Sequence, residues 1–213
     1  MIHRYSFLLI GLLLCSFQGA FSQTGGFYIG VNVSDFREQL VPETNFRPGL
    51  QVGMFKRYEL HEFVEMHAGL EYAQRGAQAA GIQRPQRLGT QFHYLGLRVS
   101  GKVYLARNHA FFAKVGVVPG LLLIAEEVAK IPGGEPSIQK TKYFLDTFNR
   151  MDLTVTGGLG VRLLFNGQKV ELETGYDYQV PSFYQDIPAN PIRPHLGGIH
   201  LLARYFWGKK RAE

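Results

Sequence analysis

The feature of this sequence that most constrains its fold is an alternation of apolar and polar residues with a period of two. In the stretch KVELETGYDYQV, residues 169–180, the carboxylates Glu171, Glu173 and Asp177 alternate with apolar and aromatic residues. Successive side chains of a β-strand point to opposite faces of the sheet, so this spacing predicts a strand whose two faces meet different surroundings. In a soluble barrel the apolar row would face a core, whereas in a membrane barrel it would face lipid.

The same alternation, bounded by turn residues, occurs in eight segments of the chain. These segments are residues 25–34, 46–58, 62–75, 91–105, 110–121, 151–165, 169–179 and 196–207. The connections between them alternate in length. Three are short, namely 59–61, 106–109 and 166–168, and the last contains the hairpin signal Asn166-Gly167. Four are long, namely 35–45, 76–90, 122–150 and 180–195.

This alternation of short and long connections places all short turns at one end of an up-and-down sheet and all long loops at the other. Outer-membrane barrels have this arrangement, together with an even number of strands. We therefore predict an all-β fold, an eight-stranded antiparallel up-and-down transmembrane β-barrel with short periplasmic turns and long extracellular loops. The bacterial outer membrane is the predicted location.

The first 22 residues have the features of a secretory signal peptide. A basic start is followed by an apolar run from Phe7 to Phe17 and by the small residues Ala20 and Ser22. The run is too short for a membrane-spanning helix, which needs roughly 20 apolar residues. We predict a signal peptide at 1–22 and one barrel domain at 23–213. Cleavage after Ser22 would remove Cys15, so the barrel domain would contain no cysteine.

One face of the predicted strands carries no charge, and the opposite face carries acids and bases in equal number. The charged residues predicted to face the barrel interior are Glu65, Glu71, Arg98, Lys102, Lys114, Arg162, Glu171, Glu173, Asp177 and Arg204. An eight-stranded barrel is just wide enough for side chains to fill. Because an isolated ion out of water costs several kcal/mol, these side chains are expected to pair as a barrel-interior charge network.

Outward-facing aromatic residues are predicted near both ends of the strands, where interfacial belts are expected in a membrane barrel. At the short-turn end they are Phe27, Tyr58, Phe111, Phe165, Tyr205 and Trp207. At the long-loop end they are Tyr72, Tyr176 and Tyr178.

Three segments resemble a known family. They are the opening strand GGFYIGVNVSDF, the glycine-bearing strand TVTGGLGVRLLF and the closing strand GGIHLLARYFW. On these the chain resembles the small outer-membrane β-barrel family of the Bacteroidota type, described as PorT-like or as the outer membrane protein β-barrel domain. The hydrophilic tail GKKRAE after Trp207 departs from the many barrels that end on the aromatic residue. The resemblance implies the barrel fold, and the family name also covers a component linked to protein secretion.

The sequence gives no sign of catalysis or of a cofactor. No spacing brings a Ser-His-acid set together, and no histidine pair has the short ligand spacing of a zinc site, so neither an acyl-transferring enzyme nor a metal protein is expected. The net charge of +6 is not gathered in any long basic run before the terminal GKKRAE, so no nucleic-acid partner is expected.

The expected partners are the lipid bilayer and outer-membrane lipids, with envelope or secretion proteins as further candidates. We predict a structural or surface-binding role, with the long extracellular loops as interaction sites. Two alternatives stay open at this point. The first is a narrow channel or a secretion-associated membrane component, and the second is a soluble lipocalin-like carrier of an apolar ligand.

Overall fold

The computed structural model describes residues 24–37, 44–80, 87–106, 109–130, 137–140, 150–165, 168–180 and 195–207. Its strands are β1 (Thr24–Arg37), β2 (Thr44–His61), β3 (Val64–Ala80), β4 (Arg87–Tyr104), β5 (Phe111–Lys130), β6 (Ser137–Lys140), β7 (Met151–Phe165), β8 (Gln168–Gln179) and β9 (His195–Trp207). No helix in these ranges is long and apolar enough to cross a membrane. The predicted signal peptide, the Asn166-Gly167 turn and the terminal GKKRAE lie outside the described residues.

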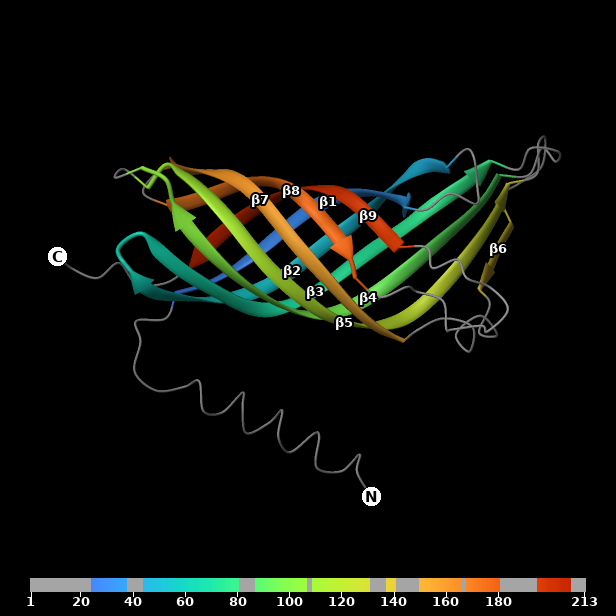
Figure 1. Cartoon of the computed structure of the whole chain (residues 1–213), viewed down its shortest axis with the longest axis horizontal. Coiled ribbons are helices and arrows are strands. Elements are labelled where there is room, and N and C mark those ends of the chain that lie inside the picture. Colours follow the sequence, from blue (N-terminus) through green and yellow to red (C-terminus); the bar gives the residue numbers. More distant parts are fainter. Residues whose placement is uncertain are drawn as a thin grey trace, which may run out of the picture.

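Eight of the strands form a closed antiparallel barrel (Figure 1). Each pairs with the next along the order β1, β2, β3, β4, β5, β7, β8, β9. The ring closes because β9 also pairs with β1, for example Tyr205 with Phe27. The predicted eight-stranded up-and-down barrel is thus confirmed, with every strand paired on both sides so that the barrel has no open edge.

The strands on one side of the barrel are longer than the sequence pattern predicted. The β3–β4 ladder continues to the pair Ala80 and Arg87, and the β4–β5 ladder continues to Lys130. The short β6 pairs with this outer part of β5, at the right-hand end of the molecule in Figure 1. The prediction that 76–90 and 122–150 are loops was therefore wrong for much of both segments. In β5 the alternation is broken because a register shift opposite His93 and Tyr94 inserts one extra residue between Leu122 and Ile124, although the pairing with β4 continues.

The barrel presents its apolar side chains outward and its polar side chains inward. In the middle of the strands Leu70, Leu159 and Val115 expose 55%, 59% and 64% of their surface on the outer face. Glu71 and Lys114, which adjoin Leu70 and Val115 in sequence, point inward and are buried. A lipocalin-like carrier requires the opposite arrangement, with an apolar interior for its ligand. The carrier alternative is therefore set aside.

The outward aromatic residues at the periplasmic end include a contacting group. Phe27 packs against Tyr205 with ring centroids 5.4 Å apart, and against Trp207 at 5.9 Å. Tyr58 pairs with Met66 of the outward row and is buried, beside the register shift between Glu59 and His61 that ends the regular β2–β3 pairing. The side chain of Phe165 lies outside the described part of the structure.

Candidate functional site

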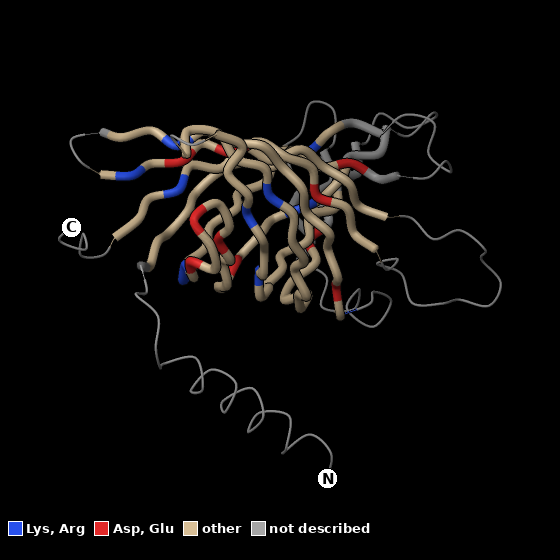
Figure 2. The backbone as a smooth tube through the Cα atoms, turned by 60° about the vertical axis from the view of Figure 1, so that its left-hand side comes forward, with Lys and Arg blue, Asp and Glu red and all other residues tan. Residues whose placement is uncertain are grey.

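The structure places all ten of the charged residues predicted from the sequence inside the barrel. Nine are buried, and the side chain of Arg162 is 8% exposed. They come from six strands, because every second residue of a strand points into the lumen. Figure 2 shows Lys and Arg positions beside Asp and Glu positions on neighbouring strands. Within the lumen these side chains form three groups, described from the periplasmic end upward.

The lowest group gathers around Glu65 and Glu171. Lys102 Nζ lies 2.7 Å from an oxygen of Glu171 and 3.2 Å from an oxygen of Glu65. Arg162 Nη2 bridges the same two carboxylates, at 2.8 Å from Glu171 and 3.2 Å from Glu65. The register sets Arg162 directly opposite Glu171, whereas Glu65 comes from 97 residues earlier in the chain. The Arg162 guanidinium also lies 4.4 Å from the centre of the Tyr104 ring, within cation–π range.

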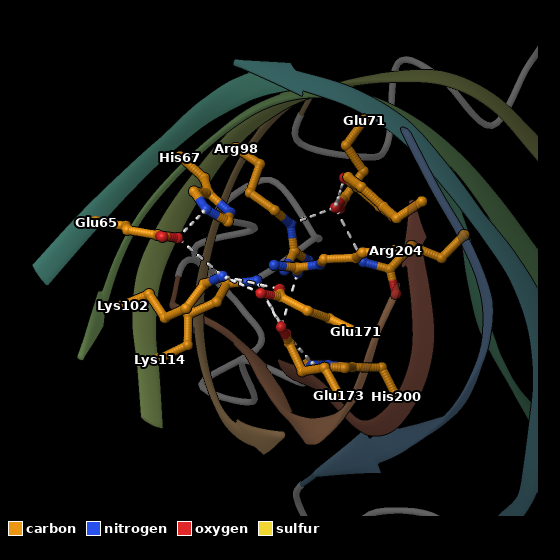
Figure 3. A network of polar contacts seen from close by, with 12 residues as sticks. Glu65, His67, Glu71, Arg98, Lys102, Lys114, Glu171, Glu173, His200 and Arg204 are labelled. Atoms are coloured by element: carbon orange, nitrogen blue, oxygen red, sulfur yellow. Dashed lines mark hydrogen bonds and ion pairs between the residues drawn. The ribbon is translucent and has the colours of Figure 1, made fainter. Parts of the chain in front are cut away.

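The middle group is built on Glu173 of β8. Its carboxylate accepts a hydrogen bond from Lys114 Nζ at 2.9 Å and forms an ion pair with Arg204 Nη2 at 2.9 Å. His200 Nε2 lies 3.3 Å away. Figure 3 shows these side chains converging on the centre of the lumen from three different strands. One carboxylate therefore serves two buried cations and one imidazole.

The upper group is built on Glu71 of β3. One of its oxygens accepts hydrogen bonds from the Tyr28 hydroxyl at 2.6 Å, from Gln51 Nε2 at 3.0 Å and from Arg98 Nε at 2.5 Å. Three donors on a single carboxylate oxygen therefore stabilise the charged form of Glu71 in a buried site.

Asp177 links this upper group to the middle one. Its Oδ1 lies 3.1 Å from His200 Nδ1, and its Oδ2 lies 3.7 Å from Arg75 Nη2. The imidazole of His200 therefore bridges Asp177 and Glu173.

Three interior charges were missed by the sequence prediction. Arg57 pairs with Glu65 at 3.3 Å, and Arg75 pairs with Asp152 at 3.3 Å. Arg57, Arg75 and Asp152 lie at or near the ends of the predicted strands, where fewer flanking residues define the alternation. A signal was available in the alternation itself. Arg75 lies an even number of residues from the inward Glu71 on β3, and Asp152 lies two residues from the inward Thr154 on β7. With them, the described interior holds seven basic and six acidic side chains, besides His67 and His200.

Apolar and aromatic side chains also pack inside the lumen, near both of its ends. On the extracellular side, Phe92, Tyr94, Leu122, Ala125 and Leu196 form one buried cluster contributed by β4, β5 and β9. On the periplasmic side, Phe55 meets Phe206 edge-to-face at 5.3 Å. Tyr104 and Phe112 are buried among the ion pairs, with the ammonium of Lys102 5.3 and 4.7 Å from the centres of their rings. The described lumen is therefore filled by charged and aromatic side chains packed together.

The chemistry available in this interior is ion pairing and hydrogen bonding. Within the described ranges no cluster of His, Cys, Asp and Glu is arranged to hold a metal ion. The expectation that the protein has no catalytic activity stays a prediction.

Comparison with known proteins gives the family. The family described as outer membrane protein beta-barrel domain matches residues 21–182. No curated protein matches the chain. Among solved structures, the chain is similar to Ail, the attachment invasion locus protein of Yersinia pestis, in its complex with the heparin analogue sucrose octasulfate. The two share 12% identity over 87% of this chain and 99% of that chain, with a TM-score of 0.47.

Two further solved structures are similar at low identity. Neisserial surface protein A shares 14% identity over 85% of this chain and 96% of that chain, with a TM-score of 0.47. The N-terminal β-barrel domain of Pseudomonas aeruginosa OprF shares 9% identity over 85% and 97%, with a TM-score of 0.35. The family match covers most of the barrel, from before β1 to the end of β8. The chain thus belongs to the outer membrane protein β-barrel domain family and is a protein of the bacterial outer membrane.

Proposed function

We propose that the protein is a closed, non-conducting barrel whose extracellular end serves as a binding surface at the cell exterior. The observation that carries this proposal is the length of four adjacent strands. β2, β3, β4 and β5 contain 18, 17, 18 and 20 residues, whereas a tilted strand crosses the bilayer with roughly 9 to 11. The surplus forms a rigid sheet above the membrane, extended by β6.

A polar cluster on the outer face supports the position of the membrane boundary. The Tyr72 hydroxyl lies 2.6 Å from His93 Nδ1, and Gln74 Nε2 donates a hydrogen bond to the same hydroxyl at 3.1 Å. His93 Nε2 lies 3.8 Å from Glu126. The apolar outward row of β3 ends at this cluster, and the strand then continues to Ala80. Residues beyond the cluster are outside the apolar band and are available to partners from the medium.

The filled lumen supports a binding role over the competing channel function. Ion pairs and buried aromatic side chains occupy the described interior, and a conducting pore would need a continuous water path past them. Function then depends on the outer end, since binding residues are commonly carried by loops on a rigid scaffold. Envelope and secretion proteins are among the partners that such a surface would meet.

The test shortens the extracellular sheet without touching the barrel. Ala77 and Thr90 are directly paired in the β3–β4 ladder, so replacing residues 78–89 by Asn-Gly leaves a two-residue hairpin loop of a favoured type. The matched control replaces the periplasmic turn Glu62-Phe63 by Asn-Gly. Both variants and the wild type are placed in nanodiscs after each has shown a heat-dependent shift in gel mobility.

The three proteins are then tested on one panel of immobilised lipopolysaccharide, bacterial polysaccharide and extracellular matrix proteins. We expect the wild type and the turn control to bind at least one surface that the shortened variant does not bind. Identical binding by all three, or binding by none, would contradict the proposal. In planar bilayers we expect no stepwise current from the wild type, and steady steps would make the narrow channel the better description.

A further inference from the structure

A small cavity inside the barrel is lined by three cations and by no carboxylate. Arg98 of β4, Lys114 of β5 and Arg204 of β9 reach it from different sides, and Ser100 lies beside Arg98 on the same strand. The remaining wall is largely aromatic and includes Tyr28. Figure 3 shows the charged ends of Arg98, Lys114 and Arg204 directed toward the same region of the lumen.

Several polar atoms of the cavity wall have no hydrogen-bond partner among the described residues. They are Arg98 Nη1, Arg204 Nε and Ser100 Oγ. Each of the three residues is nine-tenths or more buried, at 4%, 2% and 2% exposure. All three atoms are able to donate a hydrogen bond, so the wall is suited to an acceptor. Donors of this kind in a protein interior normally have a partner.

The carboxylates near these cations lie outside the cavity lining and are shared. Glu173 is divided between Lys114 and Arg204, as described above, and Glu71 binds Arg98 through Nε and leaves its two terminal nitrogens for other partners. Asp177 lies 3.9 Å from Arg98 Nη2 but also contacts His200. The cavity is therefore locally positive although the barrel interior as a whole is nearly balanced.

We propose that this cavity is a binding site for a single monatomic anion of the size of chloride. Its accessible volume is about 10 Å³, which suits one particle of roughly the size of a water molecule and excludes a phosphate or a sulfate. The guanidinium groups of Arg98 and Arg204 lie 5.8 and 5.4 Å from the centre of the Tyr28 ring, so the aromatic wall holds both cations beside the site. The anion would satisfy the free donors and offset the repulsion among the three cations.

The binding measurement uses the full barrel, refolded in the presence of the anion because the residues of the site are buried inside the filled lumen. Crystals grown in sodium bromide should give one anomalous peak at the bromine edge inside the cavity. In solution, the folded fraction in urea should rise with chloride and not with gluconate at equal sodium concentration. Well above the dissociation constant, each tenfold rise in chloride should raise the ratio of folded to unfolded protein up to tenfold.

A variant with a built-in anion makes the test specific to this cavity. Ser100→Asp places a carboxylate at the cavity wall, so the dependence on chloride should disappear while the barrel stays folded without chloride. The matched control is Thr156→Asp, which changes a buried hydroxyl that does not line the cavity. This control should lower stability and keep the dependence on chloride. If Ser100→Asp does not refold, Ser100→Ala is measured in its place. The chloride concentration needed for a given stabilisation of Ser100→Ala should be several-fold higher than for the wild type.

The proposal is overturned if the cavity contains water only, with no bromine signal and with equal stability in chloride and gluconate. It is also overturned if the stability of Ser100→Asp depends on chloride as strongly as that of the wild type. Where Ser100→Ala takes its place, the same result for Ser100→Ala overturns the proposal. Each of these results is independent of whether the extracellular sheet binds a partner.

Discussion

A charge placed on the outer face of the barrel should be costly in the middle of a strand and cheap at its end. Leu159 is the ninth residue of the fifteen in β7 and is 59% exposed, so it faces the centre of the bilayer. Leu163 has the same outward parity, lies two residues from the end of the same strand and is 47% exposed. The substitutions Leu159→Arg and Leu163→Arg make the same chemical change on the same face of the same strand at two depths.

The expected difference follows from what surrounds each side chain. Neither leucine is part of the buried interior, so little packing is lost at either site, and the change in stability comes from moving a guanidinium from water into lipid. Arginine on the lipid face costs about 2–4 kcal/mol at the midplane and about 0–1 kcal/mol near the interface. At about 1.4 kcal/mol for each factor of ten, Leu159→Arg should lower the ratio of folded to unfolded protein by roughly 30-fold to 700-fold.

The measurement is a urea titration of refolding into lipid vesicles, read from the gel band whose mobility changes on boiling. Leu163→Arg serves as the control for effects on expression, on the unfolded chain and on net charge. Equal costs at the two positions, or a larger cost at Leu163, would show that β7 is not oriented in the bilayer as described.

Further predictions concern the interior and the strand contacts. Glu173→Gln should lower the free energy of unfolding by roughly 3–5 kcal/mol in the same titration, because it leaves Lys114 and Arg204 buried without their carboxylate. A loss below about 1 kcal/mol would mean that water reaches the site. Arg162→Gln should cost less, since its two carboxylates keep another cation, and a larger loss than for Glu173→Gln would reverse this ranking. Gly69→Ala should cost about 1–3 kcal/mol because its new methyl group would collide with the backbone of β2. Gly101→Ala should be nearly neutral because no other atom lies within 4 Å of the position of its methyl group. Equal melting temperatures of these two variants would contradict the described β2–β3 contact.

The barrel could be predicted from the sequence because lipid and lumen impose opposite demands on neighbouring residues. Along much of β8 buried and exposed positions alternate, and the predicted segment 169–179 differs from the strand in the structure by one residue. Along β5 a register shift between Leu122 and Ile124 interrupts the alternation, so the pattern ends there although the outer part of the strand stays paired as far as Lys130. The strand β6 lies in this outer region, where the sequence pattern carries no information about backbone pairing.

The partners within the interior could not be predicted in the same way. The alternation indicates that a residue such as Arg162 points inward, but it does not say which carboxylates it meets across the lumen. That choice depends on the relative height of strands that are far apart in the sequence, which is set by the stagger of the closed barrel.

The long sequence separation of the ion pairs has a consequence for how the protein enters its membrane. Lys102 and Glu171 are 69 residues apart, and Arg162 and Glu65 are 97 residues apart. A partly assembled barrel that lacks β8 would therefore hold Lys102 without Glu171. Insertion strand by strand would bring such unpaired ions into the hydrocarbon region, at high cost. Membrane entry and closure of the ring should accordingly be one cooperative event, in which the last strands to arrive neutralise the first.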